Sequence, residues 1–366
     1  MPHRCFAVIL CCTHATAGGA AGPMYEMNKG VESMWQIPEG AHAILFVAHG
    51  CQHSATDFWD ATASCPSCLG LPEERRITKM ALAAGYAVVA VSSQDRDSRC
   101  WHHHHSAGDT PAVRETLAKF RAAHGLESVP LVAFGASSGG AFVLQAGATL
   151  GAAAVISQIM ALPPSMLPEP MPPTLFVHMA KDRRTARYVH LCLQKLRGSS
   201  ADESSRLVAH EVEVAPQRPT AAFFLARIDR LSEATATQLH STLAGSGLLD
   251  EAGYLRDDPR QTAWRQALCA SGGLCAALPG PLEGGPADSL EADASKVAEA
   301  LNVAWAIHEI MSDPMEETLR WLGKVLALHS KGHAMGGGKG GMNGSTRRRS
   351  PRAPPRPGTA GNVEEL

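Results

Sequence analysis

The stretch LVAFGASSGGAFVL, residues 131–144, constrains the fold of this 366-residue chain more than any other. Leu131 to Phe134 is a short apolar run, which predicts a buried strand. Gly135 and Gly139 then allow an abrupt reversal into a helix, because they place no side chain inside the turn. Ser137 stands at the apex, as the serine of a G-x-S-x-G pattern. We therefore expect a strand, a tight turn and a helix, with a serine at the tip.

A serine at such a turn is in a position to do chemistry. Its hydroxyl stands above the edge of the sheet, at a helix N-terminus whose free N–H groups favour a developing negative charge. The alternative is a glycine-rich turn of another doubly wound fold, without a catalytic role. The apolar strand before Ser137 and the Ala/Val/Leu-rich helix after it are the context that a nucleophile needs. With these features the chain resembles the α/β-hydrolase superfamily over about residues 40–330.

Apolar strands alternate with helices along most of the chain, which predicts an α/β fold with a doubly wound, mostly parallel sheet. We expect strands at 31–36, 43–48, 87–91, 131–134, 152–156, 174–178 and 207–214. We expect helices at 72–84, 109–123, 138–149, 182–196 and 297–307, and a final helix that starts at about 315.

Composition divides the chain into three parts. Residues 1–24 form an extension with a short apolar run, a weak targeting segment at most. Residues 25–330 form the hydrolase domain, in which residues 218–300 turn to helices separated by Gly- and Pro-rich loops. That stretch is too long for a simple connection, so we expect a helical insertion that could act as a lid. Residues 331–366 are rich in Gly, Pro and Arg, which predicts a disordered tail.

Charge and cysteine content limit the partners and the compartment. The formal net charge is −2, which argues against a nucleic-acid or anionic-membrane binder. The tail has seven Lys or Arg against two Glu, whereas the remainder has 26 basic and 33 acidic residues. Ten scattered cysteines are expected to be free thiols in a reducing compartment. This favours the cytoplasm, with export or an organelle as the alternative, and no apolar run reaches the ~20 residues of a membrane span.

The superfamily presents its catalytic residues in the chain order serine, acid, histidine. Asp182 follows the strand predicted at 174–178, which is where the resemblance places the acid. A helix N-cap is the other interpretation of Asp182, because Asp is favoured there. Both roles remain open at this point.

The general base is harder to place, because the loop after the last predicted strand, residues 215–219, contains no histidine. His308 is our choice, because it lies in an apolar segment shortly before the final helix. The alternatives are a hydrogen-bonded core histidine at 308, or a base supplied by His240 in the insertion. The other histidines that we considered lie in a helix, in a strand or near the tail, at His190, His210, His329 and His333.

The oxyanion of such a reaction is held by backbone N–H groups. The resemblance implies one donor at Ser138, directly after the nucleophile, and the other at Cys51. His49-Gly50-Cys51 resembles the HG motif of the family, with Cys51 in the place of a frequent glycine. Gly50 would let the backbone approach the substrate closely.

These residues lead us to expect a serine hydrolase that cleaves an ester of a small molecule through an acyl-enzyme, without cofactor or metal. The alternatives are an acyltransferase with the same residues and a non-catalytic binding protein of this fold.

Cys65 and Cys68 form a lone C-x-x-C, which could form a local disulfide or, less readily, part of a zinc site. The four histidines at 102–105 are expected to form a solvated loop rather than a metal site. His49-Gly50-Cys51, residues 65–75 and His308-Glu309 resemble a plant or algal branch of the superfamily, to which we attach no substrate.

Overall fold

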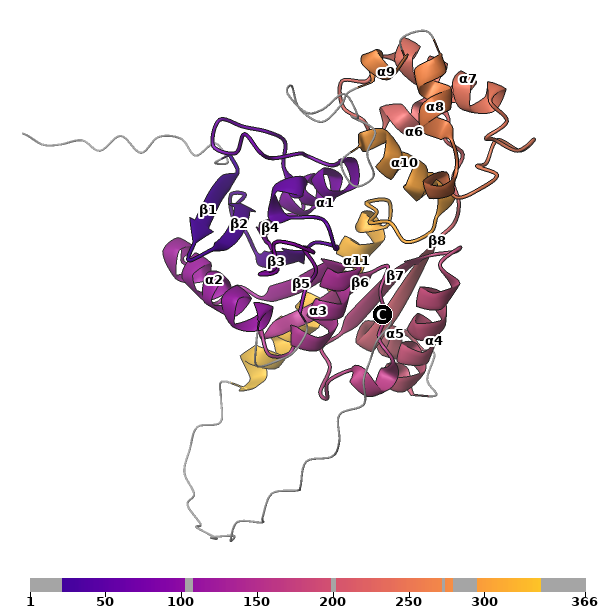
Figure 1. Cartoon of the computed structure of the whole chain (residues 1–366). Helices are drawn as coiled ribbons and strands as arrows, with labels where there is room; N and C mark the ends of the chain where they lie inside the picture. The colour runs from indigo at the N-terminus through magenta and orange to yellow at the C-terminus, as the bar shows by residue number, and fades with distance from the viewer. Residues whose placement is uncertain (1–21, 103–107, 199–201, 272–273, 279–294, 337–366) are drawn as a thin grey trace, which may run out of the picture. The chain divides into compact units, whose positions relative to one another are not determined.

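The computed structural model describes residues 22–102, 108–198, 202–271, 274–278 and 295–336. Its strands are β1 (Met24–Asn28), β2 (Val31–Gln36), β3 (Ala43–Ala48), β4 (Tyr86–Val91), β5 (Leu131–Ala136), β6 (Ala152–Gln158), β7 (Thr174–Met179) and β8 (Ala209–Val214). They form one eight-stranded sheet in the order β1-β2-β4-β3-β5-β6-β7-β8 (Figure 1). Strand β2 runs antiparallel to β1 and β4, and all other neighbours are parallel. The predicted mostly parallel α/β sheet is confirmed.

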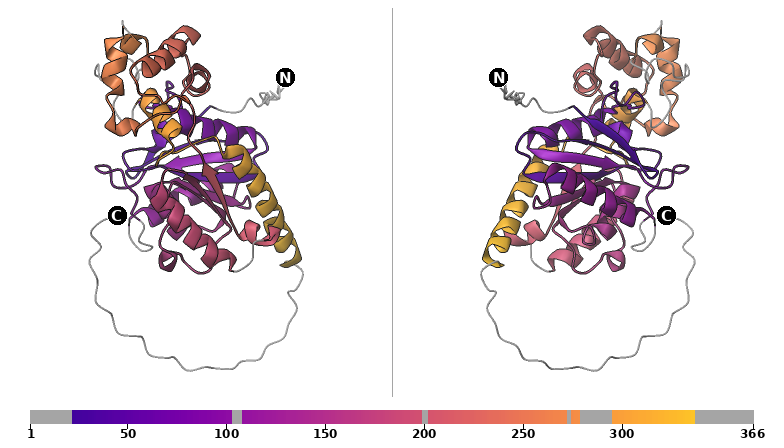
Figure 2. Two further views of the ribbon diagram at one scale, coloured as in Figure 1. Left: turned by 90° about the vertical axis from the view of Figure 1, so that its right-hand side faces the viewer. Right: turned by 90° about the vertical axis from the view of Figure 1, so that its left-hand side faces the viewer.

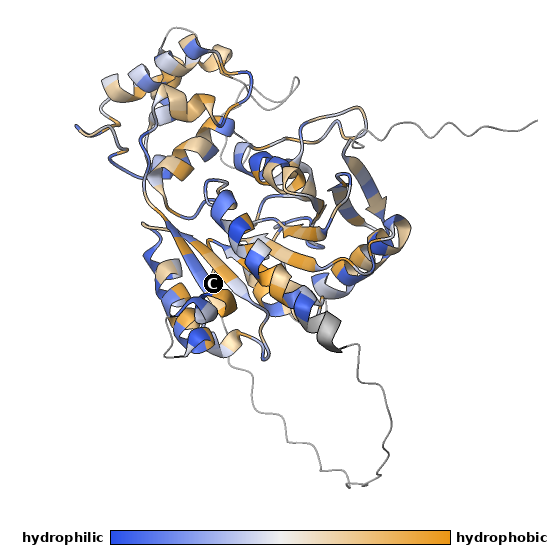
Figure 3. Cartoon of the chain, turned by 180° about the vertical axis from the view of Figure 1, so that it is seen from behind, coloured by the Kyte–Doolittle hydropathy of each residue, from blue (hydrophilic) through white to orange (hydrophobic). Residues whose placement is uncertain are grey.

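The central strands are largely apolar because helices cover both faces of the sheet. Every residue of β3, β4, β5 and β7 is buried. Helices α2 (Asp109–His124), α3 (Ser138–Ala146) and α4 (Arg183–Arg197) pack on one face. Helices α1 (Pro72–Ala83), α10 (Lys296–Trp305) and α11 (Met315–Gly336) contribute side chains to the apolar cluster on the other face (Figure 2). Coloured by hydropathy, the central strands are mostly hydrophobic, whereas the helices carry polar residues as well (Figure 3).

Helical elements follow β8, where the sequence predicts an insertion. They are α6 (Ala221–Leu225), α7 (Glu233–Gly245), the 3-10 helix η3 (Pro259–Gln261), α8 (Trp264–Ala270) and α9 (Leu274–Ala277). Buried side chains of this segment, such as Phe224, Leu239 and Trp264, belong to the same apolar cluster as those of α1. The helices that the structure describes after β8 thus belong to one compact unit with the sheet.

Three local differences from the sequence prediction have physical reasons. Strand β1 is not predicted, because it is a short and largely exposed edge strand. The strand expected from residue 207 begins at Ala209, because helix α5 (Glu203–Val208) precedes it. The side chain of Asp202 caps α5 by accepting the Ser205 N–H at 2.8 Å. Helix α3 ends at Ala146 rather than 149, at the C-cap Gly147.

The two ends of the chain fall mostly outside the described residues. These include all but the last three residues of the predicted extension and residues 337–366 of the predicted tail. Helix α11 continues to Gly336, beyond the predicted start of the tail at 331. None of the described helices is both long and apolar enough to cross a membrane.

The topology of the sheet determines where functional residues can gather. Parallel strands end at a common edge, and ligands of such sheets bind outside the carboxyl ends of the strands. Gly50 follows β3, Ser137 follows β5 and Asp182 follows β7. The sheet therefore brings segments far apart in the sequence to one edge.

Candidate active site

Ser137 occupies the turn between β5 and α3 in a strained backbone conformation. Its φ is 51° and its ψ −117°, a region that residues other than glycine rarely adopt. A Cβ on Gly135 would collide with the backbone of Gly139, and a Cβ on Gly139 with the carbonyl of Ala48. Only glycine fits at these two positions. The turn holds the serine hydroxyl at the carboxyl edge of the sheet and makes Ser138 the first residue of α3.

Asp182 both caps a helix and faces the serine site. Its carboxylate accepts the Thr185 N–H at 3.0 Å and the Thr185 hydroxyl at 2.7 Å, which caps α4. The same carboxylate accepts the Nδ1–H of His308 at 2.9 Å. Burial opposes ionisation, but the hydrogen bonds from His308 and Thr185 outweigh it and lower the pKa of Asp182 below its usual value. Asp182 is therefore ionised at neutral pH.

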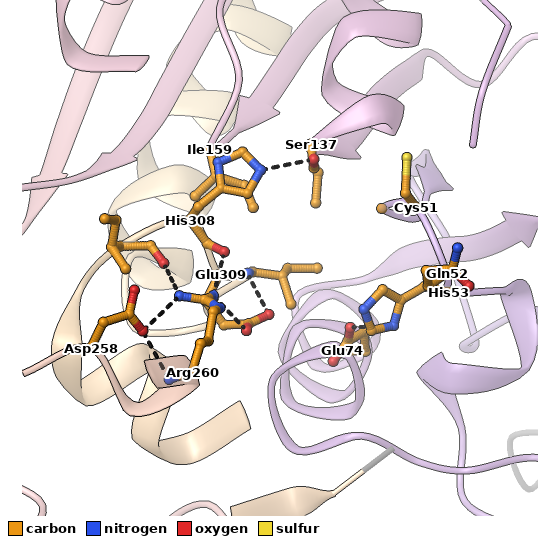
Figure 4. Close-up of a pocket in the computed structure, with 14 residues that line it drawn as sticks. Cys51, Gln52, His53, Glu74, Ser137, Ile159, Asp258, Arg260, His308 and Glu309 are labelled. Carbon is orange, nitrogen blue, oxygen red and sulfur yellow. Dashed lines mark hydrogen bonds and ion pairs between the residues drawn. The ribbon is translucent and has the colours of Figure 1, made fainter. Parts of the chain in front are cut away.

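His308 lies in the loop between α10 and α11 and joins the two other residues. Its Nε2 is 3.0 Å from the hydroxyl oxygen of Ser137 (Figure 4). Because Nδ1 donates to Asp182, Nε2 of the neutral ring is left to accept the serine proton. Ser137, His308 and Asp182 thus form one hydrogen-bonded chain across three segments.

The loop after β3 lies against the serine. Burial lowers the pKa of His49 to about 4, so its ring is neutral. Its Nδ1–H donates to the carbonyl of Gly50 at 2.6 Å, and its Nε2 accepts the Ser93 N–H at 3.0 Å. A trans peptide directs its C=O and N–H oppositely, so the N–H of Cys51 points away from His49. A Cβ on Gly50 would lie 3.6 Å from that of Ser137.

Six cysteines form disulfides, which corrects the expectation of free thiols for these residues. The pairs are Cys51–Cys100, Cys65–Cys68 and Cys269–Cys275. Disulfides persist in oxidising compartments. Cys192 is a buried free thiol, and Cys5, Cys11 and Cys12 lie outside the described residues.

A cavity of about 480 Å³ opens in front of the serine. Its apolar part is formed by Ile159, Ile307 and Ile310, next to Ser137 and His308. Its polar part is formed by Gln52, His53, Glu74, Asp258, Arg260 and Glu309 (Figure 4). This volume is in the range of small-molecule sites.

Buried charges line the polar part of this cavity. Burial would lower the pKa of His53, but its hydrogen bond with Asp57 and the charges of Glu74 and Asp57 raise that pKa to about 10. Burial raises the pKa of Glu74 to about 7 and that of Glu299 well above its usual value. At neutral pH the cavity wall therefore contains an imidazolium at His53, beside a carboxyl at Glu74 whose ionisation burial opposes.

The structure places the alternative histidines elsewhere. His240 lies on α7, where its Nδ1 is 3.0 Å from the carbonyl oxygen of Pro219. His190 pairs with Gln194 on α4, and His210 on β8 pairs with Glu317. His329 and His333 lie on α11. Of the histidine run, residues 103–105 are not described, and no group of three potential metal ligands occurs among the residues that are.

Two residues beside the site were not found from the sequence. Gln158, at the end of β6, accepts the Ser137 N–H with its carbonyl at 3.0 Å and holds the loop after His308 with its side chain. Arg260, on η3, donates to the backbone of that same loop. The polar pair Ser157 and Gln158 at the end of the otherwise apolar β6, at the carboxyl edge of the sheet, was a usable signal. The sequence gives no comparable signal for Arg260, because this residue lies in a loop-rich segment without a motif.

No protein-family model matches the sequence, and a comparison with curated proteins gives no match. Solved structures do match. A serine hydrolase without a lid from Xanthomonas campestris is 16% identical, with 55% of this chain and 86% of that chain covered and a TM-score of 0.35. A dienelactone hydrolase from Anabaena variabilis is 21% identical, with 60% of this chain and 95% of that chain covered and a TM-score of 0.36. An acetyl xylan esterase from Aspergillus awamori is 14% identical, with 44% of this chain and 73% of that chain covered and a TM-score of 0.34.

The fold itself is recognisable from the chain's own geometry. A mostly parallel sheet is covered by helices on both faces, and a strained G-x-S-x-G turn follows its central strand β5. An acid after β7 and a histidine after α10 follow in the order typical of one superfamily. The chain therefore has the fold of the α/β-hydrolase superfamily.

Proposed function

We propose that the protein is a serine hydrolase that cleaves an ester of a small molecule through Ser137, His308 and Asp182. The observation that carries this proposal is the continuous chain of hydrogen bonds. It runs 3.0 Å from Ser137 Oγ to His308 Nε2 and 2.9 Å from His308 Nδ1 to Asp182. These are the distances and the order that a nucleophile, a base and an orienting acid require.

In the first half of the proposed reaction, Ser137 Oγ attacks the ester carbonyl while His308 Nε2 takes the serine proton. Asp182 stabilises the imidazolium and fixes the ring, as its ionised state at neutral pH allows. The backbone N–H groups of Cys51 and Ser138 accommodate the oxyanion. Collapse of the tetrahedral intermediate expels the alcohol, which receives the proton from His308.

In the second half, water attacks the acyl-enzyme with His308 again as the base, and the acid product leaves. The cavity of about 480 Å³ has a size that suits a small molecule. Its apolar part beside Ser137 suits a short acyl group, whereas the charged residues beyond it suit a polar alcohol portion.

The test is covalent labelling of the full-length protein with a fluorophosphonate probe, followed by mass spectrometry of the peptides. We expect one labelled peptide, modified at Ser137, and hydrolysis of short-chain 4-nitrophenyl esters. Absence of labelling at any serine would favour a non-catalytic binding protein. Transfer of the acyl group to an added alcohol, in preference to water, would favour an acyltransferase.

Asp182→Asn separates the two roles of this residue. Asn also caps helices well, so the melting temperature should change little. The neutral amide cannot stabilise the imidazolium and favours the wrong tautomer, so kcat should fall by about 10⁴-fold. Steady-state kinetics and thermal melts of the same preparation measure both effects. A large loss of stability with kcat retained in the folded fraction would show that Asp182 is a cap only.

A further inference from the structure

Arg260 connects the helical insertion to the loop that contains His308. Its guanidinium donates to the carbonyl of Ile307 at 2.9 Å and to that of His308 at 2.9 Å (Figure 4). Glu309 lies 3.4 Å and Asp258 3.6 Å from the same group. One planar side chain thus donates to two consecutive carbonyls, and two carboxylates hold it in place.

The backbone that receives these hydrogen bonds is in an unfavourable conformation. Ala306 has a φ of 61° and His308 a φ of 48°. Residues other than glycine seldom adopt the left-handed region, and such backbone persists when surrounding contacts determine it. The position of the His308 imidazole therefore depends on what holds this loop.

On the sheet side, the loop is held by Gln158. Its amide accepts the Met311 N–H at 3.0 Å and donates to the Met311 carbonyl at 2.9 Å. On the α10 side, Asn302 donates to Glu309 at 2.8 Å. Arg260 supplies the support from the insertion, directly at the peptide that precedes His308 and at His308 itself.

We propose that Arg260 is a positioning residue that fixes His308 between Ser137 and Asp182. The segment after β8 then supplies a residue that completes the active site. This inference rests on the proposed function. Arg260 also lines the cavity, with a side chain that is 36% exposed, so direct binding of the substrate is the competing role that the experiment must separate.

The test compares the full-length parent with Arg260→Ala, using a short neutral ester such as 4-nitrophenyl acetate. Misplacement of the base should lower kcat about tenfold to a hundredfold, with KM nearly unchanged. The rate of fluorophosphonate labelling should fall by a similar factor, because the same base activates Ser137. Added guanidinium or methylguanidinium should restore part of the lost kcat by occupying the vacated position.

Two further variants control for charge and for the insertion itself. Arg260→Lys keeps the charge but loses the paired planar donors, so its kcat should stay well below that of the parent. Arg230→Gln changes an exposed arginine of the same insertion and should have parental kinetics. Thermal melts of all variants identify any loss of fold.

A spectroscopic readout tests the position of His308 without turnover. In the parent, the Nδ1 proton shared with Asp182 should give a low-field proton NMR signal, which Arg230→Gln retains. In Arg260→Ala this signal should broaden or disappear while the melting temperature stays close to that of the parent.

The proposal is overturned if Arg260→Ala keeps kcat within twofold of the parent, or if only KM rises, which would make Arg260 a substrate-binding residue. It is also overturned if guanidinium restores nothing, or if Arg260→Lys is fully active. Each of these outcomes leaves an active parent and so leaves the proposed function intact. Failure of the proposed function would instead appear as a parent that neither hydrolyses esters nor labels at Ser137.

Discussion

Ser137→Ala is expected to abolish ester hydrolysis and fluorophosphonate labelling together. The hydroxyl is the atom that would attack the substrate, and no other group can replace it at the tip of the turn after β5. Loss of a serine nucleophile in comparable sites costs about 10⁶-fold in kcat. Alanine keeps the backbone of the turn, so the melting temperature should stay close to that of the parent. Kinetics, probe labelling and thermal melts of one preparation measure the loss of hydrolysis, the loss of labelling and the retained melting temperature.

An exposed serine on α5 provides the matched control. Ser204→Ala should leave hydrolysis and labelling at the level of the parent, since Ser204 is exposed and its hydroxyl donates to the nearby Asp202. If Ser137→Ala still forms a covalent adduct, another residue is the nucleophile and the proposed mechanism is wrong.

His308→Ala should lower kcat by about 10⁵- to 10⁶-fold and leave KM nearly unchanged, because a general base acts in the transition state. Nε2 of His308 lies 3.0 Å from the Ser137 hydroxyl. Without it the serine proton has no acceptor in place. Steady-state and single-turnover kinetics on the same short ester measure the effect.

His240→Ala is the control, because His240 was the competing base and its Nδ1 faces the carbonyl of Pro219. This variant should keep near-parental activity. The reverse result, with activity lost in His240→Ala and kept in His308→Ala, would move the base to the insertion. Full activity in both variants would contradict a histidine-assisted serine mechanism.

Local sequence predicted the fold well, because the decisive signals lie within short windows. The run at 131–144 contains a strand, a turn and a helix. Gly135 and Gly139 are required there because a Cβ at either position would collide with neighbouring backbone atoms. The sequence offered a helix cap and a catalytic acid as alternative roles for Asp182, and the structure shows the cap together with a hydrogen bond to His308. These features are determined by residues that are adjacent in the chain, so they can be identified from the sequence alone.

The rest of the site depends on contacts between distant segments. Arg260 reaches a loop 47 residues away, and Cys51 pairs with a partner 49 residues away. Gln158 pairs with Met311 across 153 residues. No local pattern reports such contacts, so His308 was chosen by elimination. The residues that hold its loop became visible only in the structure.

The disulfide between Cys51 and Cys100 has a practical consequence for producing the protein. It ties the loop after β3 to the loop after β4, beside the peptide whose N–H is proposed to hold the oxyanion. Expression in a reducing bacterial cytosol would yield thiols at these positions and leave the two loops joined by hydrogen bonds alone, such as those between Ser93 and His49 and between Gln52 and Ser98. A secretory host, or a strain with an oxidising cytosol, is therefore the appropriate source. Purification buffers should contain no thiol reductant.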